Sequence, residues 1–279
     1  MSGDITVRIA LAQSGLVPLD AQVLLAHVLG RDRAWLVAHG DDALPRERSD
    51  AFLAFARRRR DGEPVAYLTG MREFWGLALQ VSPAVLIPRP ETETLVELAL
   101  ARLPIDRDLR VLDLGTGSGA IALAIARERP RAAILATDVS ADALEVAHEN
   151  ARRLSIGNVE FVQADWYEGV ASTWRGAAFD LVASNPPYVA AADPHLGEGD
   201  VRFEPGLALT PGGDGFGAIA RIVAGARARL ASAGTLVVEH GYDQADAVRA
   251  LFIAAGFAEV VGARDLAGVP RVVAGRPVP

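Results

Sequence analysis

A glycine-rich turn between an apolar strand and an apolar helix is the feature that most limits how this chain can fold. Residues 110–114 are short, β-branched and leucine-rich, as is typical of a buried strand. Residues 120–126 have the apolar character of a helix. The turn between them consists of Gly115, Thr116, Gly117, Ser118 and Gly119. Because glycine permits a sharp turn and a close approach to a ligand, this order predicts the opening of a doubly wound α/β domain.

Acidic residues follow the next two predicted strands. Residues 133–137 lead into Asp138, about 20 residues past the glycines, where a carboxylate can accept hydrogen bonds from both ribose hydroxyls of a nucleoside. Residues 159–163 lead to Asp165 and Trp166, which can accept from an adenine amino group and flank the base. Taken singly, Trp166 is as often a core residue as a ligand contact.

The glycine turn alone leaves the bound nucleotide open. Gly115, Gly117 and Ala120 also satisfy the dinucleotide pattern G-x-G-x-x-A, which favours a nicotinamide cofactor. One such motif serves one nucleoside, however, and this sequence has no second glycine motif for the second nucleoside of a dinucleotide. The motif after the fourth strand also has no obvious use in hydride transfer.

That motif is Asn185-Pro186-Pro187-Tyr188, directly after the apolar residues 179–184. Proline fixes its own φ and pushes the preceding residue toward an extended conformation, so the motif predicts a stiff corner. The corner can present the Asn185 side-chain oxygen and the Pro186 carbonyl as two acceptors, with the Tyr188 ring beside them. This suits a planar NH2 group, either a carboxamide or the exocyclic amine of a base. The alternative is a loop stiffened by two prolines, with Tyr188 as packing.

A planar NH2 group is a poor nucleophile because its lone pair is delocalised. An enzyme that alkylates it must hold both N–H bonds and aim the nitrogen at the electrophile, and such positioning can contribute roughly 7–11 kcal/mol. Acceptors that tighten as charge grows on nitrogen add electrostatic stabilisation. The corner therefore predicts catalysis by orientation.

The order of turn, two acids and corner resembles a class I S-adenosylmethionine methyltransferase that methylates amino groups. The N-P-P-Y corner is shared by DNA adenine-N6 and protein glutamine-N5 methyltransferases. Three further stretches resemble the glutamine enzymes: residues 64–75, residues 86–93, and residues 203–215. From about residue 10 to its end, the chain resembles the peptide chain release factor glutamine methyltransferase (PrmC/HemK) family. A sister family methylates a ribosomal protein, but Pro90-Glu91-Thr92-Glu93 favours the release-factor branch.

The resemblance implies methyl transfer from S-adenosylmethionine to N5 of the glutamine in a Gly-Gly-Gln loop of release factors, with S-adenosylhomocysteine as product. The cofactor would contact Gly115, Thr116, Gly117, Ser118, Gly119, Asp138, Asp165, Trp166 and Asn185. The substrate would contact Asn185, Pro186, Pro187 and Tyr188, of which Asn185, Pro186 and Tyr188 would be catalytic. Tyr188 would pack on the amide plane or wall the slot. Arg89 or Glu91 would shape the mouth of the site or serve a structural role.

Charge and composition limit the classes of partner that the chain is expected to bind. The net charge is −7 and the pI about 5.3, so the chain as a whole lacks the basic footprint of a duplex-binding enzyme, and we expect no direct DNA binding. An adenine-N6 nucleic-acid methyltransferase remains the main alternative. The run Arg57 to Arg60 is the basic exception: a solvated helix end, or a docking patch for an acidic protein or RNA.

Other classes of site are excluded or disfavoured. The sequence has no cysteine, which rules out disulfides, thiolate metal sites and a cysteine nucleophile, and we expect no metal. It has no long uncharged apolar run, and residues 1–4 lack the features of a signal peptide, so we expect no membrane partner and a cytoplasmic location. We expect a monomer.

The 279 residues suit two domains. We expect a helical domain over residues 1–62 that recognises the protein substrate, and a β-hairpin linker over residues 63–89 that is extended from Ala66 to Leu68. The methyltransferase domain would span residues 90–279, with a Rossmann-like sheet of about seven strands, the last of them antiparallel. Residues 189–215 would form a long irregular segment in which His195 is an exposed loop histidine.

Overall fold

The computed structural model describes residues 5–169, 174, 176 and 178–278. Its contacts divide the chain into two compact units, which are described separately. The first comprises Met1–Met71 with Glu198–Phe203, and the second comprises Arg72–Gly197 with Glu204–Pro279. The prediction about the residues preceding Ile5 lies outside the described residues. None of the helices that the structure describes has the length and apolar character needed to cross a bilayer.

The first unit is a small helical bundle. Local sequence sets its helix ends: the Thr6 and Asp32 side chains cap two helix starts, and Gly30 ends a helix in the left-handed conformation. Leu24, Leu25 and Phe52 are fully buried in its core. The helices are α1 (Val7–Gln13), α2 (Pro18–Leu29), α3 (Arg33–Ala38), α4 (Arg46–Arg60) and α5 (Val65–Thr69).

Helix α5 corrects one expectation, because Ala66 to Leu68 were predicted to be extended. Pro64 precedes the helix and Gly70 ends it at φ 69°, the arrangement that favours a short helix. The predicted hairpin follows as β1 (Met71–Phe74) and β2 (Leu77–Gln80). Trp75 and Gly76 both have positive φ at its turn, as a tight two-residue hairpin requires.

The arginine run lies in the last turn of α4 with Arg57, Arg58 and Arg60 exposed, as expected for a solvated helix end, whereas Arg59 is partly buried. Arg59 forms ion pairs with Asp20 at 2.7 Å and with Asp200 at 2.6 Å, and its side chain is only 22% exposed. Arg58 pairs with Glu63. These arginines stabilise the first unit internally, and Arg59 ties residues 198–203 to the helical bundle.

The second unit is built on a seven-stranded sheet in the order β5-β4-β3-β6-β7-β9-β8. The five neighbouring strands β5, β4, β3, β6 and β7 are parallel to one another. β9 runs antiparallel to both β7 and β8, so the predicted antiparallel last strand is confirmed. The pairing of Leu114 with both Thr137 and Ser184 brings three strand ends to one edge. The strands are β3 (Arg110–Leu114), β4 (Ala133–Asp138), β5 (Val159–Gln163), β6 (Phe179–Ser184), β7 (Leu230–Glu239), β8 (Phe257–Arg264) and β9 (Pro270–Pro277).

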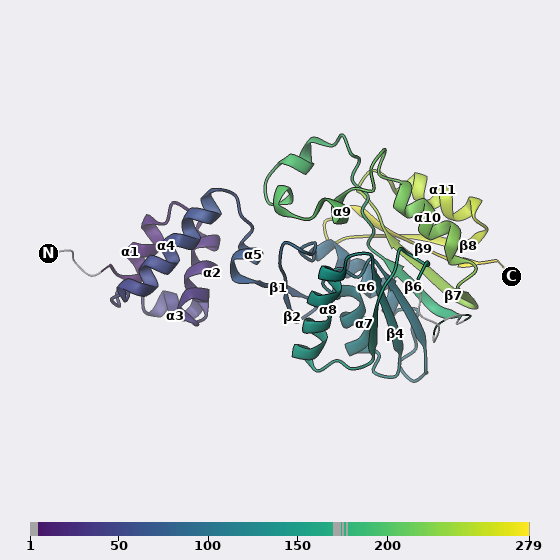
Figure 1. Cartoon of the computed structure of the whole chain (residues 1–279), viewed down its shortest axis with the longest axis horizontal. Helices are drawn as coiled ribbons and strands as arrows, with labels where there is room; N and C mark the ends of the chain where they lie inside the picture. Colours follow the sequence, from purple (N-terminus) through teal and green to yellow (C-terminus); the bar gives the residue numbers. More distant parts are fainter. Residues whose placement is uncertain (1–4, 170–173, 175, 177, 279) are drawn as a thin grey trace. The chain divides into compact units, whose positions relative to one another are not determined.

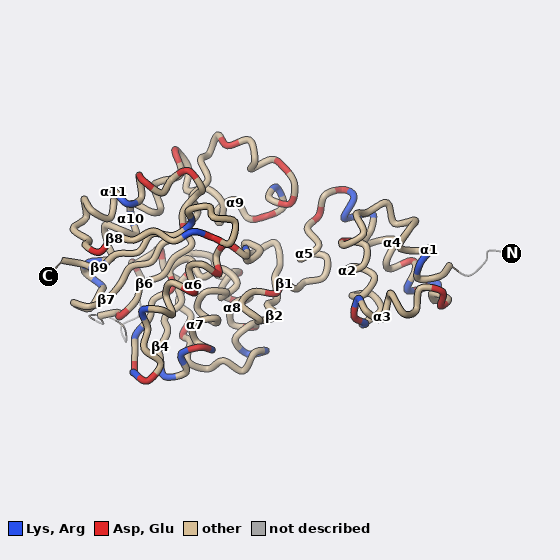
Figure 2. The backbone as a smooth tube through the Cα atoms, turned by 180° about the vertical axis from the view of Figure 1, so that it is seen from behind, with Lys and Arg blue, Asp and Glu red and all other residues tan. Residues whose placement is uncertain are grey.

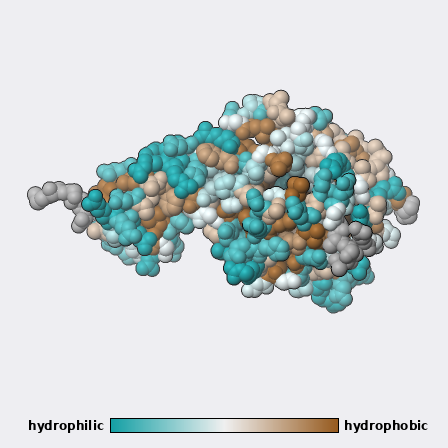
Figure 3. Space-filling view, viewed as in Figure 1, coloured by the Kyte–Doolittle hydropathy of each residue, from teal (hydrophilic) through white to brown (hydrophobic). Residues whose placement is uncertain are grey.

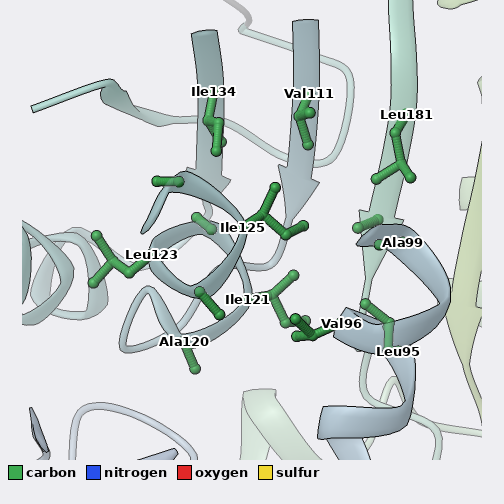
Figure 4. Close-up of a cluster of buried hydrophobic side chains, with 14 of the residues drawn as sticks. Leu95, Val96, Ala99, Val111, Ala120, Ile121, Leu123, Ile125, Ile134 and Leu181 are labelled. Atoms are coloured by element: carbon green, nitrogen blue, oxygen red, sulfur yellow. The ribbon is translucent and has the colours of Figure 1, made fainter. Parts of the chain in front are cut away.

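Helices cover both faces of this sheet (Figure 1). One face carries α6 (Glu93–Leu100), α7 (Ala120–Glu128) and α8 (Ala141–Leu154), and the other carries α10 (Gly217–Ala226) and α11 (Ala245–Ala254). Figure 4 shows Ile125 of α7 pointing toward the strands and Ile121 lying beside Val96 of α6. The two apolar cores hold the sheet between its helix layers.

The segment after the N-P-P-Y corner is more ordered than predicted. It contains the 3-10 turns η3 (Pro194–Gly197) and η4 (Val201–Phe203) and the short helix α9 (Gly206–Leu209). His195 is exposed, as predicted, and its Nδ1 lies 2.7 Å from Asp193.

Candidate active site

A cavity of about 460 Å³ lies at the edge where β3, β4 and β6 end. Its volume is in the range of small-molecule sites. Nine residues predicted for the site line it: Gly115, Thr116, Gly117, Ser118, Asp138, Asp165, Trp166, Asn185 and Pro187. The other three predicted residues, Gly119, Pro186 and Tyr188, are not among the described residues that line it. The parallel sheet therefore gathers most of the predicted site into one cavity.

The glycine turn forms the floor of this cavity. Gly115 and Thr116 both donate their backbone N–H to the carbonyl of Thr137, at 2.8 and 2.9 Å, which pins the turn to β4. Gly117 has φ 55°, and a Cβ built there would meet no atom within 4 Å. Open space over a left-handed glycine is what a close backbone approach to a ligand needs.

Gly119 is closely packed and is not among the described residues that line the cavity. It has φ 83°, and a Cβ there would lie 3.0 Å from Leu123 and 3.3 Å from Ala147. It also precedes α7 at the N-cap position. Gly119 therefore allows close packing between α7 and α8, and its predicted cofactor contact stays a prediction.

Asp138 is held ready to accept hydrogen bonds. Its Oδ2 accepts from the backbone of Gly117 and its Oδ1 from that of Ser140, both at 2.9 Å. Burial raises the pKa of Asp138, and these backbone donors oppose the rise. A carboxylate oxygen has two acceptor sites, so each oxygen retains capacity for a ligand hydroxyl.

The far part of the cavity contains Asp165, Trp166 and Arg221. Trp166 has φ 53°, a left-handed conformation that costs a non-glycine residue roughly 1–2 kcal/mol. Its ring lies 3.5 Å from the position of a Cβ on Gly115. Asp165 pairs with Arg221 of α10 at 3.0 Å. Sequence reasoning missed Arg221, because no motif marks a lone arginine on an apolar helix.

The N-P-P-Y corner is held in place by residues that sequence reasoning did not assign to it. The Asn185 Nδ2 donates to the Thr92 hydroxyl at 3.1 Å, and both residues line the cavity. Thr92 is buried at the end of the 3-10 turn η1 (Pro90–Thr92). A Cβ on Gly215 would lie 2.4 Å from the Tyr188 carbonyl oxygen, so only glycine fits beside the corner.

Tyr188, which was predicted to pack on the substrate amide or wall its slot, is not among the described residues that line the cavity. Its hydroxyl donates to Glu239 Oε1 at 3.3 Å, and its carbonyl accepts from Gln244 Nε2 at 3.0 Å. Burial raises the pKa of the Tyr188 phenol. The chain turns away from the cavity after Pro187, so the ring packs into the core between the sheet and α10.

Two residues near the mouth were predicted without a definite role. Arg89 lines the cavity and forms an ion pair with the buried carboxylate of Glu204. Glu204 also accepts from the backbone of Ile87 at 3.2 Å. Glu91 is not among the described lining residues. Leu207 of α9 lines the cavity with 77% of its surface exposed, and Figure 3 shows hydrophobic residues at the surface over α9.

The chain resembles known methyltransferases over nearly its whole length. The family described as "PrmC N-terminal domain" matches residues 5–70, and that described as "Methyltransferase domain" matches residues 105–243. The "Release factor glutamine methyltransferase" of Escherichia coli (strain K12) is 50% identical over 257 residues, 92% of this chain and 91% of that protein. The protein of the same name from Xylella fastidiosa (strain Temecula1 / ATCC 700964) is 52% identical over 268 residues, 96% of each.

Among solved structures, a methyltransferase from Pyrococcus furiosus superposes with a TM-score of 0.55 and 18% identity, covering 80% of this chain and 98% of that one. At this identity the similarity concerns the fold alone. Together with the matched methyltransferase domain, it confirms the predicted class I methyltransferase fold.

Proposed function

The chain belongs to the release factor glutamine methyltransferase family, and we propose that its N-P-P-Y corner holds the glutamine side chain that is methylated. The protein is an S-adenosylmethionine-dependent enzyme that methylates a glutamine of peptide chain release factors. The observation that supports the proposed site most strongly is the shared cavity, which brings the glycine turn, Asp138 and Asn185 together. We further propose that the acceptor is the glutamine of a Gly-Gly-Gln loop.

The residues that line the cavity fit the cofactor. The open space over Gly117 leaves room for its methionine part, the spare acceptor sites of Asp138 suit two ribose hydroxyls, and Asp165 with Trp166 suits an adenine. Bound S-adenosylmethionine supplies an electrophilic methyl group on a sulfonium sulfur. The protein contributes a concave, partly apolar wall that excludes water from that group.

The corner supplies the orientation. With its Nδ2 committed to Thr92, Asn185 keeps Oδ1 as an acceptor for one substrate N–H. We propose that the Pro186 carbonyl accepts the other N–H. Two fixed acceptors hold the amide flat and turn one face of its nitrogen toward the cofactor, which is catalysis by positioning. The site needs no general base, because an N-methylated amide that carries positive charge is acidic enough for water to accept its proton.

We propose that the first unit recognises the release factor and that the domain limits lie near residues 62 and 89. The matched "PrmC N-terminal domain", which covers residues 5–70, supports a role specific to this family. We also propose that the enzyme is a monomer, that it works in the cytoplasm where release factors act, and that it binds no DNA directly. In Figure 2, basic and acidic residues are interspersed along both units, in keeping with the last proposal.

Mass spectrometry of a release factor after incubation with the enzyme and S-adenosylmethionine tests the function. We expect one added methyl group on the glutamine of the Gly-Gly-Gln loop. Double-stranded and single-stranded nucleic acid with labelled cofactor serve as competing acceptors. Label in nucleic acid but not in the release factor would establish the adenine-N6 alternative and overturn the proposal.

A further inference from the structure

The hydrogen bonds behind Asn185 have a consequence for the reaction. We propose that Thr92 and Glu239 are positioning residues that together fix which side of the Asn185 amide faces the substrate. The proposal rests on the proposed function, because it assumes that the substrate is an NH2 group that needs an acceptor. Thr92 lies in the turn before α6 and Glu239 ends β7, so two distant segments would act on one side chain.

A primary amide can present either an acceptor or a donor to its ligand. If Oδ1 of Asn185 faces the substrate, it can accept an N–H. If Nδ2 faces it, two NH2 groups oppose each other and no hydrogen bond forms. Since the two ends of an amide have nearly the same shape, packing alone cannot choose between them. The partner of the other end must make the choice, and in this structure that partner is the Thr92 hydroxyl, 3.1 Å from Nδ2.

A threonine hydroxyl can also present either polarity, because it has one donor hydrogen and two acceptor sites. Its hydrogen must therefore be committed elsewhere if it is to accept from Asn185. The buried carboxyl of Glu239, 1% exposed, meets this need. Hydrogen bonding from Thr92 and Tyr188 lowers the pKa of Glu239, against the larger effect of burial that raises it to about 7. Within the described residues Glu239 Oε2 has no hydrogen-bond partner, so it can carry the proton of the carboxyl while Oε1 accepts hydrogen bonds.

These contacts form a chain of fixed polarity. In the proposed arrangement Glu239 accepts the Thr92 hydrogen, so that the Thr92 hydroxyl accepts from Asn185 Nδ2 at 3.1 Å and Oδ1 of Asn185 is left for the substrate. Without the carboxyl, the hydroxyl could turn and donate to Oδ1, and the amide could flip. Glu239 also accepts from the Tyr188 hydroxyl, so the same carboxyl holds both ends of the N-P-P-Y corner.

Thr92→Val, which keeps the shape and removes the hydroxyl, tests the first link in the full-length enzyme. We expect kcat for a release factor to fall about 10- to 100-fold, the factor that corresponds to one misplaced buried hydrogen bond. The dissociation constant for S-adenosylmethionine, measured by calorimetry, should stay within about 2-fold, because the cofactor contacts are untouched. Thr92→Ser, which restores the hydroxyl, should recover most of kcat. A kcat close to that of the wild type in Thr92→Val, with a loss in Thr92→Ser instead, would show that Thr92 only fills space.

A double-mutant cycle separates positioning from a general loss of structure. If Thr92 acts through Asn185, then Thr92→Val should reduce kcat by less than about 2-fold when it is added to Asn185→Ala. Multiplicative losses would overturn the proposal. The Thr92 and Asn185 cycle decides, because Glu239→Leu would also remove the contact of Glu239 with the Tyr188 hydroxyl.

The proposed function and the proposed roles of Thr92 and Glu239 can fail separately. A wild-type enzyme that leaves the release factor unmethylated refutes the proposed function itself. A wild-type enzyme that methylates it, combined with a multiplicative cycle, refutes only the role of Thr92 and Glu239. A readout without turnover is side-chain amide exchange by NMR, in which the Asn185 NH2 should be protected in the wild type and lose that protection in Thr92→Val.

Discussion

Replacing Asn150 with alanine should weaken both the fold and cofactor binding. This fully buried residue of α8 joins the hairpin to the glycine turn. Its Oδ1 accepts from the Gln80 N–H at 2.6 Å, and its Nδ2 donates to the carbonyls of Gln80 and Ser118, both at 2.9 Å. Asn150→Ala leaves three backbone groups without a protein partner.

The magnitude follows from those three groups. An unsatisfied buried polar group costs about 1–3 kcal/mol, so the upper limit for three is about 9 kcal/mol. Water can enter the space left by the side chain and pair with some of them, which lowers the loss. We expect the free energy of unfolding to fall by about 3–5 kcal/mol. Because Ser118 lines the cavity, the dissociation constant for S-adenosylmethionine should also rise, by about 10-fold.

Urea denaturation and calorimetric titration measure the two effects, and Asn158→Ala is the matched control. The half-buried Asn158 also bonds three backbone groups, the carbonyls of Ala126, Arg129 and Ala132 at 3.0–3.3 Å, but it does not line the cavity. Its loss should lower stability and leave cofactor affinity unchanged. If Asn150→Ala unfolds at the same urea concentration as the wild type, or if both variants bind the cofactor equally well, the reasoning is refuted.

Three further predictions concern the cofactor, pH and the first unit. Asp138→Ala should raise the dissociation constant for S-adenosylmethionine before it affects the reaction, and an unchanged constant would reject a ribose contact. Burial raises the pKa of Glu239 from 4.5 to about 7, so the folded state holds a proton that the unfolded state loses, and stability should fall as pH rises through that interval. Glu239→Gln should remove up to about 3 kcal/mol of this pH dependence, and denaturation curves of equal pH dependence would contradict it. A chain without residues 1–71 should bind the cofactor but fail to methylate an intact release factor, whereas full activity would exclude substrate recognition by that unit.

The sequence was informative wherever a residue's place along a strand decides its place in space. Gly117, Asp138 and Asn185 each follow a parallel strand, and parallel strands end at one edge, so their meeting in one cavity could be predicted. The predicted fold, with its antiparallel last strand, followed from the same pattern of strands and helices.

The direction that the chain takes after a strand ends could not be predicted in the same way. Two prolines make a corner stiff but do not determine where the chain goes next. The packing of Tyr188 against the core was therefore not predicted. Arg221 comes from a segment far away in sequence, and nothing in its own neighbourhood indicates a cavity. Thr92 was missed although its neighbours Arg89 and Glu91 were placed at the mouth of the site. Helix α5 was mistaken for a strand, because five residues are too few to show a helical period.

The central claim is that Asn185 acts by binding the substrate amide and not by stabilising the fold. Single-turnover methylation of a release factor by Asn185→Ala, with the cofactor dissociation constant measured on the same sample, tests it most directly. We expect the rate to fall by about 100-fold or more, the effect of losing one preorganised polar contact, while cofactor affinity changes little. A rate close to that of the wild type, or a parallel loss of rate and cofactor affinity, would contradict the claim.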